Sequence, residues 1–528
     1  MRFALPYLSR LLGLMLILGW AELGFAQTLR IGTKTLPSSA DPHYHYSGEN
    51  SSMLPHIYDG LIALDKELHP QPSLATAWRV IDENIWEFDL RKDVYFHDGS
   101  KFTAEDIVYT FNRVPAVRNS PGSYERLTRR VKKIEVLTPH RIRFHTDGPH
   151  PSLDHDLAYV MILPHHLGLD VETTSFNAGT SAIGTGPYKF VEWVPGQFFK
   201  LERNANYWGG TPTWTDVVFT AITSDPTRIA ALLNDQVDLT DFVPLADRES
   251  LGKNPHITLH DNAAARLMFI HMDSDRDVSP YITDIDGRPF TKNPLKDARV
   301  RRALSKALDR QAIVTYLLDG AGIPASQILP ASFEGSSPDL LPDVYDVEGA
   351  KKLLAEAGYP NGFRLVLHSP SDRYPNDAKV AQAIAQMWWR IGVLTEVETQ
   401  TRNIFFPAAA RQEFSVYFSG WGDALVANAL LGLVHTYDAE SGFGSGNRAR
   451  YSNSEVDTLI ETALTTLDKD KQIELLERAQ AIAFREDQGL IPLYHPTYSW
   501  ASSNKISYRA NLEGRTQAML AKPKQVAP

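Results

Sequence analysis

The chain contains no cysteine among its 528 residues, and this absence removes several kinds of chemistry. Neither a disulfide framework nor a thiol nucleophile can form. A lipid anchor attached to a cysteine at a cleavage site is excluded as well. Long apolar runs are also scarce, since beyond the first residues no stretch approaches the ~20 apolar residues of a membrane-spanning helix.

Motifs of common enzyme classes are missing too. The chain has neither the HExxH pattern of zinc hydrolases nor the GxSxG pattern of serine hydrolases. Gly184 and Gly186 form a GxG, but the third glycine and the following helix of a dinucleotide site are absent. A hydrolase is therefore the least favoured of the functions that we consider, and no catalytic residue is predicted.

Negative charge predominates, with 63 acidic against 53 basic side chains and a formal net charge of −10. Nucleic acid and anionic lipid are themselves negative, so neither is expected as a partner. A chain of this length exceeds what one hydrophobic core usually supports. We expect two or more domains that pack together, because no low-complexity linker separates them.

The first residues have the pattern of an export signal. Arg2 and Arg10 form a basic end, residues 11–21 are apolar, and Gly-Phe-Ala at 24–26 is a small–x–small cleavage site. We predict that residues 1–26 are a cleavable signal peptide and that the mature chain is a soluble periplasmic protein without a lipid anchor. An uncleaved membrane anchor is the alternative.

Strand and helix patterns alternate along much of the remaining chain. Residues 266–272 form a continuous apolar strand suited to a covered sheet, and 378–391 form a helix. Asp346 is predicted to cap a helix that ends at Gly358. A further helix is predicted over 297–310, with its arginines on a solvated face. Helices that alternate with strands indicate a parallel sheet, so the fold class is α/β.

The most distinctive stretch is 183–208, IGTGPYKFVEWVPGQFFKLERNANYW. Its GTGP opening predicts a tight bend, because glycine allows backbone angles that other residues resist. Two strands, 188–193 and 198–203, would then form a hairpin around a Pro-Gly turn. The order GTGPY, hairpin and NxxYW resembles the signature of family 5 extracytoplasmic solute-binding proteins, which serve oligopeptide, dipeptide and nickel ABC importers.

This resemblance covers nearly the whole mature chain. It implies a two-lobed α/β fold like that of type II periplasmic binding proteins, with an additional small domain in lobe one. The domains implied are lobe one at 27–268 with the subdomain at about 61–182, lobe two at 269–494, and a return to lobe one at 495–528.

The resemblance also implies a function. The chain would be the monomeric substrate-binding component of an ABC importer, which traps a short peptide between its lobes and delivers it to a permease and ATPase complex in the inner membrane. A non-peptide solute such as a metal chelate, a sugar, an opine or haem is the alternative, because the wider family includes such ligands. No cofactor is expected.

Five residues are candidates for ligand contact. In the peptide-binding relatives an aspartate after a strand-end tryptophan meets the ligand's amino terminus, which makes Asp423 the candidate here. One residue rather than two separates it from Trp421, so the interpretation that Asp423 caps the next helix stays open. Arg373 is the candidate for the ligand carboxylate and Arg448 a second one, because guanidinium donors form a fork that fits a carboxylate. Trp421 and Tyr46 are expected as apolar walls.

Two stretches resemble metal sites, but polar loops explain them more simply. His43, His45 and His56 lie close together in the sequence, yet no tight carboxylate group completes a site. Residues 273–284 open like a calcium loop but lack its glycine and its closing glutamate.

Overall fold

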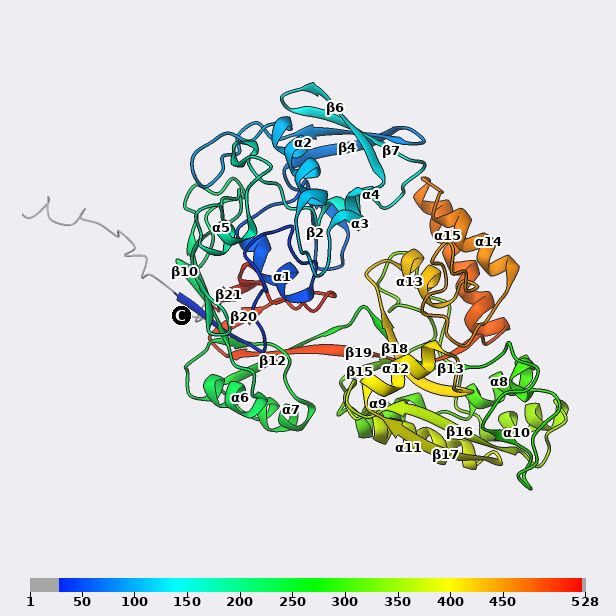
Figure 1. Cartoon of the computed structure of the whole chain (residues 1–528). Coiled ribbons are helices and arrows are strands. Elements are labelled where there is room, and N and C mark those ends of the chain that lie inside the picture. The colour runs from blue at the N-terminus through cyan, green and yellow to red at the C-terminus, as the bar shows by residue number, and fades with distance from the viewer. Residues whose placement is uncertain (1–27, 525–528) are drawn as a thin grey trace, which may run out of the picture.

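A computed structural model describes residues 28–524, and Figure 1 shows that they form two lobes of mixed helix and strand. The predicted signal peptide lies outside the described residues. One mixed sheet of 13 strands extends through both lobes, and smaller sheets accompany it. The α/β class and the two-lobed architecture predicted from the sequence are confirmed.

Lobe one is built on one half of the large sheet. Its first strand, β1 (Thr28–Thr33), pairs in parallel with β10 (Asp216–Ala221) and β11 (Leu239–Thr240). The predicted hairpin is confirmed as β8 (Tyr188–Val194) and β9 (Phe198–Arg203), and β9 pairs with β10. Further elements of this lobe are α1 (Gly48–Met53), η1 (Leu54–His56), η3 (His165–Leu167), α5 (Thr173–Asn177), α6 (Asp225–Leu233), α7 (Leu245–Gly252), β20 (Ile506–Tyr508), η6 (Ala518–Leu520) and β21 (Ala521–Pro523).

A separate antiparallel sheet forms a subdomain at the outer end of lobe one, at the top of Figure 1. Helix α2 (Ala104–Arg113) packs on this sheet, with Ile107 buried against Phe144 and other apolar side chains. Thr103 and Asp106 form a reciprocal capping box at the start of α2, because each side chain bonds the other residue's backbone. The elements here are β4 (Ala75–Asp82), β5 (Ile85–Leu90), β7 (Arg141–Thr146) and β6 (Val131–Thr138) in sheet order, with β2 (Ile62–Leu64), β3 (Pro70–Pro72), η2 (Val114–Ala116), α3 (Glu125–Thr128) and α4 (Leu153–Leu157) beside them.

Lobe two contains the other half of the large sheet. β16 (Phe363–Pro370) pairs in parallel with β17 (Val393–Gln400) and with β18 (Val416–Gly422), and β18 pairs antiparallel with β13 (Arg266–Met272). Helices cover this sheet, and a second apolar cluster joins its outer helices. The remaining elements are β14 (Ile282–Thr283), η4 (Pro294–Lys296), α8 (Ala298–Lys306), α9 (Arg310–Leu317), β15 (Gly322–Pro324), α10 (Val347–Glu356), α11 (Asp377–Trp389), α12 (Arg402–Ala410), α13 (Val426–Leu433), α14 (Ser454–Ala463), α15 (Lys469–Gln480) and the π-helical turn η5 (Ala481–Glu486).

The two lobes are joined by strands. β12 (Ile257–Ala263) pairs with the end of β19 (Leu490–Ser503) in lobe one, and the chain then enters lobe two through β13. β19 returns by itself, because its first half pairs with β13 and its second half with β11 and β12 (Figure 1). All partners of β13 belong to lobe two or to β19, so strand pairing favours a first crossing at residues 264–265 rather than at the expected position after residue 268.

The helix predicted over 297–310 is two helices. α8 ends at Lys306, and Asp309 begins α9 by accepting a hydrogen bond from the Ala312 backbone N–H at 2.9 Å. The expected solvated face is wrong for two arginines. Arg301 donates to the carbonyl oxygens of residues 487 and 488, and Arg310 donates to that of residue 492, so both are buried against the segment around β19.

The GTGP bend is present, but the reason that it requires glycine differs from the one expected. Neither Gly184 nor Gly186 has a positive φ. A Cβ on Gly184 would lie 2.0 Å from the Ile57 carbonyl oxygen, and one on Gly186 would lie 2.6 Å from the Ile57 carbonyl carbon. The Gly186 N–H also donates to that oxygen at 2.9 Å. The glycines are therefore required by close backbone approach.

Candidate functional site

Three of the five candidate residues lie together on lobe two. Arg373, Trp421 and Arg448 line one pocket of about 200 Å³. Arg373 follows the end of β16, and Trp421 lies at the end of β18. Because these two strands are parallel, their carboxyl ends meet at one edge of the sheet, where ligands of open α/β sheets bind.

Trp421 is held by two glycines. A Cβ on Gly432 would lie 2.6 Å from the indole ring and one on Gly446 2.7 Å, so the ring packs directly on both backbones. The ring is half-buried, and part of it faces the pocket. This fixed aromatic surface suits the apolar wall that the sequence predicted.

The loop that carries Arg373 is fixed while its guanidinium is left exposed. The backbone N–H groups of Arg373 and Tyr374 donate to the Asp377 carboxylate at 3.0 and 3.1 Å. The Tyr374 hydroxyl bonds both the N–H and the carbonyl of Gly420, which ties the loop to β18. The Arg373 side chain is therefore presented at the sheet edge by a constrained backbone.

Asp423 lies next to this pocket but does not line it. Its Oδ1 accepts a hydrogen bond from the Leu425 N–H at 3.0 Å, whereas the cap position of α13 is Leu425, which offers no side-chain cap. The carboxylate thus forms a turn ahead of the helix rather than the cap itself. Burial raises the pKa of Asp423, and the Leu425 N–H and the Arg126 charge from lobe one oppose this rise.

The fifth candidate, Tyr46, lies on the facing lobe. Its ring meets Tyr124 and Tyr159 edge to face, with centroids 5.3 and 5.9 Å apart, and Arg126 stacks on it at 4.2 Å. Such aromatic groups bury large rigid surfaces with little flexibility to lose. Tyr46 therefore belongs to an aromatic cluster of lobe one rather than to the pocket that holds Trp421.

Several charged residues of the facing lobe were not predicted from the sequence. Tyr46 also borders a second cavity of about 370 Å³, together with Asp241, Glu513 and Arg515. Arg515 pairs with Glu513 at 2.6 Å, and the Tyr159 hydroxyl donates to Glu513 at 2.6 Å. The tail residues 513–516 reach this place only by tertiary folding, and no local sequence signal marks them.

Asp241 is the most unusual of these groups. It is buried, its Oδ2 accepts from the Thr516 hydroxyl at 3.2 Å, and its Oδ1 has no hydrogen-bond partner among residues 28–524. Burial raises the pKa of this carboxyl to about 6. An unpaired buried carboxylate oxygen beside a cavity is suited to accept a donor from outside the chain.

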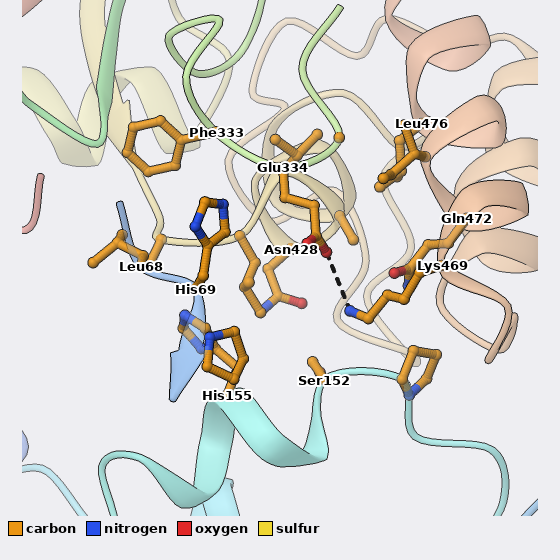
Figure 2. Close-up of a pocket in the computed structure, with 18 of the residues that line it drawn as sticks. Leu68, His69, Ser152, His155, Phe333, Glu334, Asn428, Lys469, Gln472 and Leu476 are labelled. Atoms are coloured by element: carbon orange, nitrogen blue, oxygen red, sulfur yellow. Dashed lines mark hydrogen bonds and ion pairs between the residues drawn. The ribbon is translucent and has the colours of Figure 1, made fainter. Parts of the chain in front are cut away.

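The two lobes also meet at a place away from the Trp421 pocket and the cavity beside Asp241. Figure 2 shows a cavity with His69 and His155 of lobe one on one side and Phe333, Asn428 and Lys469 of lobe two on the other. On the lobe-two side of this cavity, Lys469 forms an ion pair with Glu334 at 3.2 Å. The cavity encloses about 70 Å³, which holds a few water molecules and not a peptide. It is a packing gap where the lobes meet.

The comparisons with known proteins agree with this architecture. Residues 69–438 match the family model described as bacterial extracellular solute-binding proteins, family 5. The chain belongs to this family. Its members are binding proteins of transport systems and not enzymes, as predicted.

Individual relatives illustrate the family's range. The heme-binding protein A of Haemophilus influenzae is 28% identical over 471 residues, covering 83% of this chain and 81% of the relative. The unliganded open form of the periplasmic murein tripeptide-binding protein MppA matches with a TM-score of 0.80 at 20% identity, covering 94% of this chain and 98% of that one. The dipeptide-binding protein of Pseudoalteromonas sp. SM9913 in complex with Met-Leu matches with 0.69 at 24% identity, covering 94% and 100%.

The histidines considered as metal ligands serve this solute-binding protein in other ways. The ring nitrogens of His43 bond the Met161 carbonyl at 2.8 Å and Arg113 at 2.9 Å, and those of His56 bond Met53 and Ala518 backbone groups. Within the described range no group of three or more acidic or histidine side chains could hold a metal ion. No helix of residues 28–524 is long and apolar enough to cross a membrane.

Proposed function

We propose that this solute-binding protein captures a short peptide between its lobes in the periplasm and delivers it to a permease and ATPase complex of the inner membrane. The observation that carries the proposal is that a basic and an acidic side chain follow the ends of the adjacent strands β16 and β18, where they would suit the two ends of a peptide. Asp423 is available for an ammonium, and the exposed guanidinium of Arg373 for a carboxylate. Arg448 is a second carboxylate candidate, with Trp421 and Tyr46 as walls.

The lobe arrangement supports a capture mechanism. The match to an unliganded open form is better than the match to a dipeptide complex, so we infer that the arrangement of the lobes is the open one, with the lobes in contact at the small cavity beside His155 and Lys469. A ligand that contacts both lobes stabilises a closed arrangement relative to the open one. Closure would then mark the loaded protein for its membrane partner.

The remaining features of the proposal concern the form in which the protein acts. Residues 1–26 would be removed on export, and the absence of cysteine leaves no site for lipid attachment. We propose a monomer that diffuses to its permease. Mass spectrometry of the protein purified from a periplasmic fraction tests the removal of residues 1–26 directly, and a chain that retains these residues would contradict it.

Titration calorimetry with di- to pentapeptides tests the ligand class. We expect heat and a saturable affinity for at least one group of peptides. Native mass spectrometry of the purified protein should reveal any solute retained from the cell. The peptide assignment is rejected when no peptide binds and the retained mass is that of a sugar, an opine, a chelate or haem.

A further inference from the structure

The pocket on lobe two contains three arginines, which we call the arginine pocket: Arg266, Arg373 and Arg448. They come from the first residue of β13, the loop after β16 and the loop before α14. Aromatic side chains make up much of the remaining wall, and no acidic residue lines it. The pocket is therefore cationic and partly apolar.

Arg266 reaches this pocket because of strand pairing. β13 runs antiparallel to β18, and Arg266 lies directly opposite Gly422. A Cβ on Gly422 would lie 3.5 Å from the Arg266 guanidinium carbon, so the missing side chain lets the cation lie beside the strand end. The amino end of β13 thus adds a third positive charge to the edge where β16 and β18 end.

None of these three guanidinium groups forms an ion pair with a carboxylate of residues 28–524, whereas other arginines do, such as Arg248 with Asp261 at 2.7 Å. Two of the three contact aromatic rings. Arg373 lies 5.4 Å from the Tyr374 ring centroid and Arg448 lies 5.3 Å from that of Phe406. Most protein surfaces intersperse acidic and basic side chains, and this chain has more acidic than basic ones. Three arginines without a carboxylate partner in one pocket therefore depart from the usual surface pattern.

Gathering like charges in one pocket is electrostatically unfavourable unless anions enter it. A carboxylate binds a guanidinium through two parallel N–H···O bonds, which are among the stronger hydrogen bonds in proteins. One carboxylate satisfies one such fork and leaves the other arginines without an anion. Three arginines therefore fit a ligand that brings more than one negative group.

We propose that the solute carries at least two carboxylates, and that the arginine pocket binds both. Arg373 binds one, and Arg448 with Arg266 binds the other, while the Trp421 ring packs on the segment between them. This inference rests on the proposed function and narrows its ligand to peptides with an acidic side chain beside the carboxyl terminus. Haem shares the chemistry through its two propionates, so the test separates the two sources.

Matched peptides test the inference by calorimetry. Ala-Glu and Ala-Gln have the same shape and differ by one carboxylate, and we expect Ala-Glu to bind at least tenfold more tightly at low salt. Arg448→Gln should remove most of this preference, so that Ala-Glu and Ala-Gln bind the variant with similar affinity. Arg450→Gln is the matched control, because Arg450 lies in the same loop but stacks on Tyr437 outside the pocket.

Each outcome has a defined meaning. Equal affinity for the two peptides overturns the two-carboxylate inference and leaves the peptide-binding function standing. Absence of binding by either peptide, with hemin binding detected by its absorbance and weakened by Arg448→Gln, supports the two-carboxylate chemistry and overturns the peptide assignment. A preference for Ala-Glu that survives Arg448→Gln, Arg266→Gln and Arg373→Gln singly and together places the second carboxylate elsewhere and overturns the inference.

Discussion

Asp241 is a buried carboxylate with one oxygen unpaired, and it lowers the stability of the empty protein at neutral pH. Burial raises its pKa to about 6, above the ordinary value for an aspartate. The folded state therefore binds the proton more tightly than the unfolded state. The stability associated with the neutral form is fully present below about pH 4 and is lost as the pH rises through about 6.

Asp241→Asn should therefore raise the free energy of unfolding at pH 7.5 by roughly 2–3 kcal/mol, because about two pKa units separate the folded and unfolded states. At pH 4 the gain should vanish, since the carboxyl is already protonated. Urea unfolding followed by circular dichroism at the two pH values measures the difference. An equal gain at both values would show that charge is not the cause.

Asp423 allows a nearly isosteric test of amine recognition. Asp423→Asn keeps an oxygen that can accept from the Leu425 N–H, so the turn ahead of α13 should persist. A carboxylate in a partly desolvated site attracts an ammonium strongly, and the neutral amide does not. We expect at least a tenfold loss of affinity for a peptide with a free amino terminus.

The control for Asp423 is the same peptide with an acetylated amino terminus. Wild-type protein and Asp423→Asn should bind this neutral-ended peptide with similar affinity by calorimetry. A similar loss for both peptides would mean that the substitution disturbs the site as a whole.

At the scale of elements, the bend before β8 depends on the absence of a side chain. Gly184→Ala would place a Cβ against the Ile57 carbonyl oxygen, where a backbone must move, and should cost more than about 2 kcal/mol of stability. Gly48→Ala is the matched control, because nothing lies within 4 Å of its Cβ position at the start of α1. Thermal melting of the two variants compares them. A similar melting temperature for both would refute the close approach.

Local signals explain which elements the sequence could predict. The predicted hairpin and the predicted cap of α10 at Asp346 depend on residues within a few positions of each other, and both are present. Arg301 and Arg310 were misread because their partners are backbone carbonyls more than 180 residues away. No periodicity within α8 or α9 carries that information.

The residues of the candidate site also separate into those that the sequence could predict and those that depend on the tertiary fold. Trp421 and Arg373 were named at strand ends and Arg448 in a glycine-rich loop before a helix, and the fold brings all three to one pocket, while their contact with a ligand stays a prediction. Arg266 and Asp241 were not named. Arg266 joins the pocket through antiparallel pairing of β13 with β18, and Asp241 is buried beside a tail segment near residue 516. Both placements depend on strand order, which a single sequence does not reveal.

At the scale of the whole molecule, the facing surfaces of lobe one and lobe two must approach each other for one ligand to contact both. Small-angle X-ray scattering should show a smaller radius of gyration when a tightly binding peptide is added, because closure brings the lobes together. The Asp423→Asn protein, at peptide concentrations that saturate only the wild type, should keep the larger value. A radius unchanged by a peptide that calorimetry shows to be bound would exclude lobe closure.

β19 imposes a mechanical condition on this motion. It pairs with β13 as far as Tyr494 and with β15 of lobe two as far as Pro496, and it pairs with β12 from Thr497 onward, so on this strand rotation of one lobe on the other is concentrated at the junction of Pro496 and Thr497. Pro496 has no N–H and a restricted φ, so most of the torsion falls on the bonds between the α-carbons of Pro496 and Thr497, while the N–H groups of His495 and Thr497 lie on either side of Pro496. The amide hydrogens of these two residues should exchange with deuterium at rates that change on ligand binding, which makes this short segment a label-free reporter of the motion.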